Sequence, residues 1–260
     1  MPDAFAPDES IVYKTASDAE LPIHLFRPAA ANGPTPAIVF FFGGGWAQGS
    51  PAQFFPQCRR LAERGMLAAS AEYRVRTRHN VTPFECAADA KSAVRWMRAH
   101  AGELGIDPQR LAAGGGSAGG HLAAVAGLVA DLDEPDEDAG VSSRPDALVL
   151  FNPVLDNGPD GFGHEAVKER WQEISPLHNV GAGAPPAIVF LGDADKIIPV
   201  ATAEAFRDRM EAAGARCDLC IYPEQGHGFF NHRPEGNPHY ELTMTEAERF
   251  LASLGYIAPA

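Results

Sequence analysis

The sequence predicts an α/β protein whose central sheet is mostly parallel and flanked by helices. Short apolar segments alternate with amphipathic segments along most of its 260 residues. The apolar segments are unbroken runs of Val, Ile, Leu, Ala and Phe, which suit strands that are covered on both faces. Glycine-rich turns follow two of these runs. Strand–helix alternation builds βαβ units. We therefore expect residues 1–260 to form a single domain.

The apolar runs predict the strands in chain order. The first two, Val12–Lys14 and Leu21–Phe26, form an opening pair. The others are Ala37–Phe41, Met66–Glu72, Arg110–Ala113, Ala147–Phe151, Ala187–Leu191 and Cys217–Tyr222.

Helices are predicted where apolar residues recur at three- and four-residue spacing. In one of them, Ala87, Ala90, Val94 and Met97 share a face. The predicted helices are Ala52–Arg64, Phe84–Ala99, Ala118–Val129, Thr202–Ala213 and Tyr240–Ser253.

The chain is acidic, with 21 Lys and Arg against 34 Asp and Glu and a formal net charge of −13. Nucleic acid and anionic membranes bind cationic surfaces, so we expect neither as a partner. The first ten residues lack the basic and apolar regions of a signal peptide. We therefore expect a cytoplasmic protein, or a secreted one if a leader precedes this sequence.

The four cysteines do not indicate a disulfide-rich scaffold. Cys217 and Cys220 have C-x-x-C spacing but point to opposite faces of a predicted strand, which disfavours a metal or redox pair. Cys58 and Cys86 lie near the starts of two successive helices, where a disulfide or two buried free thiols remain open. No histidine and carboxylate cluster has metal-ligand spacing, so we expect no metal and no cofactor.

A serine nucleophile is indicated by Gly115-Gly116-Ser117-Ala118-Gly119, which has the pattern G-x-S-x-G. The motif falls between a predicted strand and a predicted helix, the context that a nucleophile elbow requires. The turn is sharp enough that larger side chains two residues on either side of Ser117 would collide. The start of the helix also stabilises developing negative charge.

Two other interpretations of this turn remain open. Its glycines could serve close packing alone. Gly114, Gly116 and Gly119 also satisfy G-x-G-x-x-G, a dinucleotide-binding pattern. That pattern expects an acidic residue at the end of a strand about 20 residues later, whereas Asp131 follows a helix.

A second glycine-rich loop, Gly43–Gly45, follows the predicted strand Ala37–Phe41. Three glycines leave backbone N–H groups unobstructed and permit positive φ angles. Such a loop can aim amides at an oxyanion.

Together these two motifs resemble the α/β-hydrolase superfamily. Within it, the chain is similar to the hormone-sensitive-lipase-like and carbohydrate-esterase group, which includes acetylxylan and feruloyl esterases. Those proteins pair an HGGGW-type loop with GGSAGGHLA at the nucleophile. The resemblance covers residues 11–254 and implies an α/β-hydrolase fold with backbone donors at Gly44, Gly45 and Ala118. Phe42 replaces the histidine that holds the family's loop by hydrogen bonding, so the support of this loop must differ.

The candidate general base is His227, which lies between two glycines after the predicted strand Cys217–Tyr222. A loop histidine there can place its ring over the sheet edge and accept the Ser117 proton. It also resembles the family's GHGF motif. The alternative is His232 in the same region.

The candidate acid is Asp195, which follows the predicted strand Ala187–Leu191. The resemblance assigns it this role, because the family pattern there is G-x-x-D-x-x-[VI]-P. A carboxylate at that strand end can accept the ring N–H of the histidine and fix its tautomer. Asp156 and Asp193 remain alternatives, with Asp193 better suited to shaping the loop. Asp195 lies 78 residues after Ser117 and 32 residues before His227. These intervals leave room for the intervening strands and helices.

The substrate pocket is predicted to include Trp46 and Phe42. Trp46, Phe54 and Phe55 could equally be core packing of the first helix. We expect His121 to tie its helix to a neighbouring loop. Residues 156–185 lack the βα pattern and are expected to form a small lid or substrate wall. Too few residues precede the strand at Ala37 for the large cap of many related enzymes.

These observations predict a serine carboxylic-ester hydrolase that acts on short acyl esters through an acyl-enzyme. The resemblance favours acetyl or feruloyl groups on carbohydrate. The expected partner is thus a small-molecule or carbohydrate ester. A serine peptidase or amidase, and a non-catalytic binding protein on a hydrolase scaffold, remain the alternatives.

Overall fold

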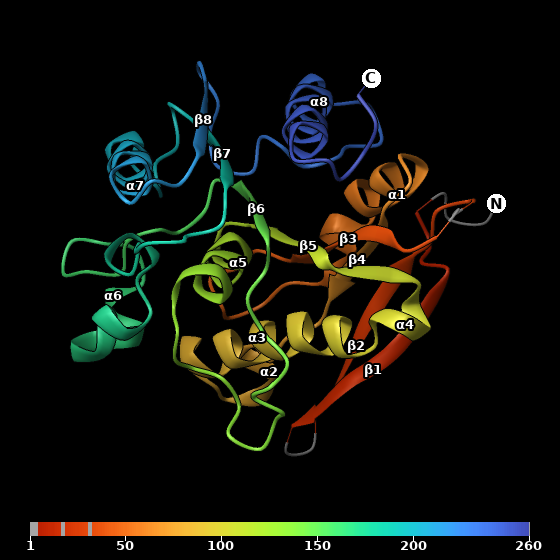
Figure 1. Cartoon of the computed structure of the whole chain (residues 1–260). Coiled ribbons are helices and arrows are strands. Elements are labelled where there is room, and N and C mark those ends of the chain that lie inside the picture. Colours follow the sequence, from red (N-terminus) through yellow and green to blue (C-terminus); the bar gives the residue numbers. More distant parts are fainter. Residues whose placement is uncertain (1–4, 17–18, 31–32, 260) are drawn as a thin grey trace.

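The computed structural model describes residues 5–16, 19–30 and 33–259. Within this part of the chain, eight strands form one sheet in the order β1-β2-β4-β3-β5-β6-β7-β8 (Figure 1). β1 and β2 are antiparallel to their neighbours, and β4, β3, β5, β6, β7 and β8 are parallel. The predicted mostly parallel sheet with an opening antiparallel pair is therefore confirmed.

The predicted strands all form; the strands at Ala147–Phe151 and Cys217–Tyr222 have the predicted bounds, and the others have shifted ends. The strands are β1 Glu9–Ala16, β2 Ala19–Phe26, β3 Thr35–Phe41, β4 Leu67–Ala71, β5 Ile106–Gly116, β6 Ala147–Phe151, β7 Ala187–Gly192 and β8 Cys217–Tyr222.

The largest difference between prediction and structure is in β5, which is longer than the expected Arg110–Ala113. It begins at Ile106, which pairs with Thr35, and it ends at Gly116, which pairs with Phe151. Polar residues at its start and glycines at its end hide both extensions from a hydrophobicity pattern. The final extension matters for the site, because β5 ends directly before Ser117.

The five predicted helices also form. The helices are α1 Phe55–Glu63, α2 Arg76–His79, α3 Pro83–Ala99, α4 Ala101–Leu104, α5 Ala118–Leu128, α6 His164–Val167, α7 Val200–Ala212 and α8 Pro238–Ser253. Three of these, α2, α4 and α6, have only four residues each, too few to show helical periodicity in the sequence.

Local chemistry sets the start of α3. The Thr82 side chain accepts the N–H of Phe84, and the Glu85 side chain accepts the N–H of Thr82. This reciprocal capping satisfies N–H groups that the first turn of a helix leaves unpaired.

Two apolar cores lie on opposite faces of the sheet. α3, α5 and α7 cover one face, and α1 and α8 cover the other (Figure 1). Cys86 belongs to the first core and Cys58 to the second, so the sheet separates them and both are free thiols. Cys217 and Cys220 also pack on opposite faces, as their spacing predicts.

The chain between β6 and β7 contains little regular structure. It holds α6 and two short 3₁₀ turns, Lys168–Glu173 and Pro176–His178. In Figure 1 this segment lies beside the sheet at the end where α6 is labelled. Among the described residues, no helix is both long enough and apolar enough to cross a bilayer.

Candidate active site

Ser117 stands on a strained turn between β5 and α5. Its φ of 54° and ψ of −118° are unusual for a residue with a side chain. The Ser117 N–H donates to the Phe151 carbonyl oxygen at 2.9 Å, which ties the turn to β6. This is the geometry of a nucleophile elbow, in which the serine hydroxyl projects above the sheet.

The flanking glycines are required by close backbone contacts. A Cβ at Gly119 would lie 2.0 Å from the Phe41 carbonyl oxygen, and one at Gly115 would lie 2.5 Å from the Gly119 carbonyl. The close backbone contacts therefore keep the turn sharp, and Ser117 at this turn lines a cavity.

His227 and Asp195 meet at the same edge of the sheet. The Nδ1 of His227 lies 2.7 Å from Oδ2 of Asp195. The other carboxylate oxygen accepts the N–H groups of Ile197 at 2.8 Å and Ile198 at 3.1 Å. The Asp195 side chain is fully buried, whereas His227 is partly exposed to solvent.

The charge state of Asp195 follows from these contacts. Burial by itself raises the pKa of Asp195, but the hydrogen bonds from His227, Ile197 and Ile198 together outweigh it and lower the pKa. Asp195 is therefore an ionised acceptor, which places the ring proton of neutral His227 on Nδ1 and leaves Nε2 with a lone pair.

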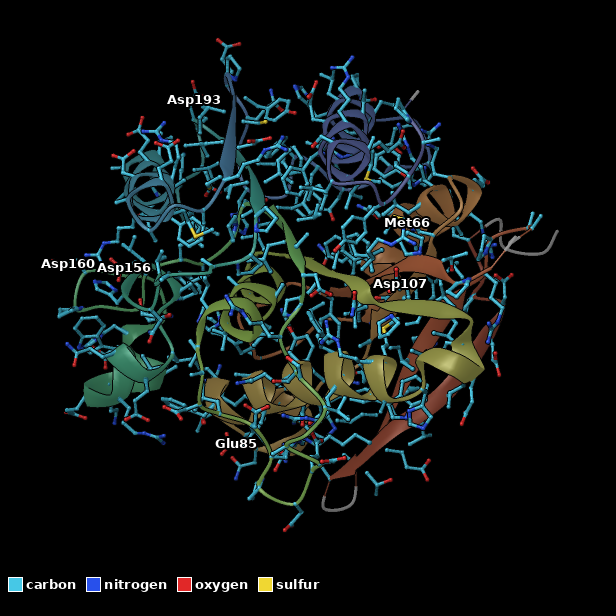
Figure 2. The ribbon with its side chains drawn as sticks, in the orientation of Figure 1. Met66, Glu85, Asp107, Asp156, Asp160 and Asp193 are labelled. Carbon is cyan, nitrogen blue, oxygen red and sulfur yellow. The ribbon has the colours of Figure 1, made fainter. Side chains whose placement is uncertain are left out.

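The alternative acids and the alternative base are engaged elsewhere. Asp193 accepts the N–H of Glu224 at 2.6 Å and so shapes the loop, as expected. Asp156 accepts the N–H of Gly158, and Figure 2 shows it beside α6, well apart from Asp193 near β8. His232 packs edge-on against Phe5 and Tyr240.

Of the three proposed oxyanion donors, Gly44 and Gly45 line the same cavity as Ser117, and Ala118 follows Ser117 in the chain. Gly44 and Gly45 adopt φ angles of 131° and 61°, and Ala118 is the first residue of α5. In the described part of the chain, no hydrogen bond occupies the N–H groups of these three residues. They are thus free to donate to a ligand.

The glycine loop is held without the family's histidine. The Tyr73 hydroxyl donates to the Phe42 carbonyl oxygen at 2.8 Å, and the two rings stack with centroids 4.1 Å apart. Gln53 Oε1 accepts the N–H of Gly43 at 2.7 Å. The prediction that Phe42 lines the substrate pocket is wrong, because its side chain is fully buried against Tyr73.

The prediction for Trp46 also needs correction. Its side chain is buried and its Nε1–H donates to Nδ1 of His121 at 3.3 Å. It lines a neighbouring cavity of about 330 Å³ rather than the cavity that contains Ser117. Phe54 stacks on Phe40, and Phe55 packs against Phe26, so both belong to the core.

His121 ties α5 to the segment after β6, as predicted. Its Nε2 lies 2.9 Å from the Asn157 Oδ1 and 3.1 Å from the Ile174 carbonyl oxygen. Complete burial lowers the pKa of His121 to about 4, so it is neutral at pH 7. A neutral ring donates from Nε2 and accepts the Trp46 N–H at Nδ1.

Three polar side chains at the site escaped prediction. Asn152 follows β6, and its amide contacts both His227 and Gly228. Gln53 Nε2 donates to Oδ1 of Asn231 at 2.9 Å. Because these amides carry no motif and lie far from their partners along the chain, no local signal identifies them.

Ser117 and His227 line one cavity of about 640 Å³. His227 is the only titratable residue in its wall; the rest of the described lining is Gly43, Gly44, Gly45, Gln48, Gly49, Ser50, Gln53, Ser117, Asn152, Phe162, Ile197, Gly228, Phe230 and Asn231. The described residues contain no group of three or more potential metal ligands. The site is therefore a neutral, hydroxyl- and amide-bearing cavity next to a serine and a histidine.

Comparisons with known proteins agree with this geometry. The family model BD-FAE matches residues 23–159, and the dienelactone hydrolase family model matches residues 147–256. The chain belongs to the BD-FAE family. This BD-FAE family protein has the α/β-hydrolase fold and resembles the hormone-sensitive-lipase-like esterases.

Two relatives of this BD-FAE family protein illustrate the similarity. Esterase LipC of Mycobacterium tuberculosis is 33% identical over 75% of this chain, which spans only 53% of LipC. Solved structures of Thermogutta terrifontis esterase 2 resemble the whole chain. The form phosphoramylated by tabun is 46% identical, covering 100% of this chain and 99% of that one, with a TM-score of 0.94. The propionate-bound form is 45% identical over 100% and 98%, with a TM-score of 0.94.

Proposed function

We propose that this protein is a serine carboxylesterase in which Ser117, His227 and Asp195 form the catalytic triad. One observation carries the proposal: the ring of His227, paired with Asp195 at 2.7 Å, lines the same cavity as the strained Ser117. The unoccupied N–H groups beside Ser117 supply the electrostatic stabilisation that acyl transfer needs.

The reaction proceeds through an acyl-enzyme. Ser117 Oγ attacks the ester carbonyl while its proton moves to His227 Nε2. Gly44, Gly45 and Ala118 donate their N–H groups to the oxyanion. His227 then gives the proton to the departing alcohol, and a water molecule hydrolyses the Ser117 ester by the same steps. Asp195 orients the ring and stabilises its transient positive charge.

The cavity wall supports an uncharged ester substrate with a short acyl chain. Apart from His227, its described lining has no ionisable side chain, so a charged acyl group would lose solvation without gaining a partner. Thermogutta terrifontis esterase 2, which the chain resembles throughout, has propionate-bound and butyrate-bound forms. These acids support acyl groups of about this size as substrates here.

The alcohol part of the substrate is proposed to carry hydroxyl groups, as in an acetylated or feruloylated sugar. Ser50, Gln48 and Asn231 offer hydroxyl and amide groups around the cavity, which can donate to and accept from sugar hydroxyls. We also propose that the segment from residue 156 to 185 is a substrate wall, since its Phe162 lines this cavity.

The test is hydrolysis of p-nitrophenyl acetate, butyrate and octanoate by the wild type and by Ser117→Ala. We expect activity on the two short esters and a loss of at least about 10³-fold in kcat for the variant, because the nucleophile is gone. Circular dichroism confirms that the variant is folded. Acetylated and feruloylated xylan and a p-nitroanilide then distinguish a carbohydrate esterase from an amidase. A wild type no faster than Ser117→Ala on every substrate would refute the proposal and favour a binding protein.

A further inference from the structure

Asn152 occupies an unusual place in the site. It follows the last residue of β6, has a φ of 33°, and is almost fully buried, with 1% of its surface exposed. Its N–H donates to the Phe190 carbonyl oxygen at 2.7 Å, so β7 holds its backbone in place. A residue with a side chain keeps such a φ only where the surrounding structure enforces it.

The contacts of Asn152 fix which way its amide points. The Gly228 N–H lies 3.0 Å from Oδ1, and a backbone N–H can only donate. The oxygen must therefore face Gly228, and Nδ2 must face Nε2 of His227, 3.3 Å away. Because Asp195 accepts a hydrogen bond from the Nδ1–H of His227, Nε2 carries a lone pair that can accept a hydrogen bond from Nδ2 of Asn152. Both hydrogen bonds agree on a single ring tautomer.

We propose that Asn152 is a positioning residue that holds His227 as the neutral Nδ1–H tautomer and opposes protonation at Nε2. It acts through His227 and not on the substrate. Its catalytic consequence rests on the function proposed above, whereas its effect on the His227 ring does not.

The physical basis is the polarity of the amide. An Nδ2–H that points at Nε2 stabilises a lone pair there and repels a second N–H. When Nε2 takes the Ser117 proton, two donors face each other, and this repulsion is relieved once the proton passes to the leaving alkoxide. The amide thus opposes the first proton transfer, from Ser117 to Nε2, and favours the second, from Nε2 to the leaving alkoxide.

Few other charges act on the ring. From the loop after β7, Asp195 contacts it, Lys196 is exposed next to Asp195, and Asp193 is bonded to the Glu224 N–H. Glu224 is on His227's own loop and is exposed. The glycine loop and the turn at Ser117 contribute no charged residue to the cavity. Apart from Ser117, Asn152 is therefore the polar side chain among the described residues that contacts Nε2 directly.

The decisive variant is Asn152→Asp, which preserves shape and an acceptor for Gly228 but places a carboxylate oxygen against Nε2. An opposite charge this close stabilises the protonated ring and raises the pKa of a neighbouring group by roughly 1–3. The titration midpoint of His227 should therefore rise by at least about one unit in ¹⁵N NMR of histidine-labelled protein. The signals are assigned with His227→Asn. This readout needs no activity, so it tests the inference even if the proposed function fails.

Kinetics provide the second readout. If the protein is an esterase, the acidic limb of its kcat/KM profile should move to higher pH by the same amount in Asn152→Asp. Gln48→Glu is the matched control: it adds the same charge to the same cavity, without a hydrogen bond to His227, and should move the midpoint much less.

Two results would overturn the inference. One is an Asn152→Asp midpoint no higher than that of Gln48→Glu. The other is an Asn152→Ala midpoint equal to that of the wild type. Asn152→Ala replaces the aspartate variant if that variant does not fold. Removal of the donor should raise the midpoint by about half a unit, whereas a purely structural role for Asn152 predicts lower activity with no change in the midpoint.

Discussion

At the scale of single residues, the glycine loop shows how one hydrogen bond is replaced by others. Phe42 cannot hydrogen-bond through its side chain, so the loop is held from three directions. Tyr73 holds the Phe42 carbonyl, Gln53 holds the Gly43 N–H, and Asn231 connects Gln53 to the histidine loop. The Asn231 Nδ2 donates to the Gly228 carbonyl oxygen at 2.8 Å. The donors and the base are therefore braced against each other.

This brace leads to a prediction for Gln53→Leu. The variant removes the acceptor of the Gly43 N–H and the donor to Asn231, so Gly44 and Gly45 lose their fixed aim. The loop acts mainly on the transition state, so kcat should fall about tenfold to a hundredfold with little change in KM. Steady-state kinetics on p-nitrophenyl butyrate measure both constants. Gln48→Leu, in the same cavity wall, should change kcat less than threefold. A higher KM with unchanged kcat would mean that Gln53 contacts substrate instead.

At the scale of elements, the segment between β6 and β7 shapes the cavity. His121 on α5 bonds to Asn157, and the Asn157 Nδ2 donates to the Phe162 carbonyl oxygen at 3.0 Å. The Phe162 ring is 37% exposed and lines three neighbouring cavities of about 640, 330 and 170 Å³. Together with Gly45 and Ile197, it therefore forms the partition between the Ser117 cavity and two side cavities.

Removal of this partition should change the preferred chain length. In Phe162→Ala the side cavities join the Ser117 cavity, and a longer acyl chain gains apolar contact worth about 0.8 kcal/mol per buried CH₂. The ratio of kcat/KM for octanoate over acetate should therefore rise at least about tenfold. Leu242→Ala, an exposed apolar side chain on α8, serves as the control and should leave the ratio unchanged. An unchanged ratio in Phe162→Ala would place the acyl chain elsewhere.

At the scale of the whole molecule, a buried ionic cluster joins the antiparallel edge of the sheet to its parallel part. Asp89 on α3 has no exposed surface and contacts Lys14 of β1 and Arg74, which follows β4, each at 2.8 Å. It also accepts the Arg74 N–H. One carboxylate thus fixes three separate segments of chain.

Asp89→Ala should destabilise the protein strongly, because Lys14 and Arg74 lose their fully buried carboxylate and keep only the partly exposed Glu134 as a partner. Loss of one member of a buried ion pair costs about 3–5 kcal/mol. Urea denaturation at pH 7 measures the change in unfolding free energy. Asp208→Ala breaks the exposed pair with Arg207 and should cost no more than about 1 kcal/mol. Equal effects of the two variants would show that the Asp89 cluster adds no stability beyond that of a surface pair.

The strands and helices were predictable where a short stretch of sequence carries the pattern that identifies them. Apolar runs identified the central strands from Ala37 onward, because a strand buried on both faces has few polar positions. The ends of β5 were not predictable, since Ile106 joins the sheet through a partner 71 residues away, at Thr35. The four-residue helices were missed because one turn contains no period.

Sequence motifs alone were enough to predict the family, the elbow at Ser117 and the candidate pairing of His227 with Asp195. Each is encoded in a short motif, because glycines and the reacting side chain must stand at fixed steps along one turn. The folded chain was needed to see that Phe42 and Trp46 pack away from the Ser117 cavity. It was also needed to see that Asn152, Gln53 and Phe162 line this cavity. Gln53 meets Asn231 across 178 residues and Asn152 meets His227 across 75. Contacts at such separations depend on strand order and register, which no short stretch of sequence contains.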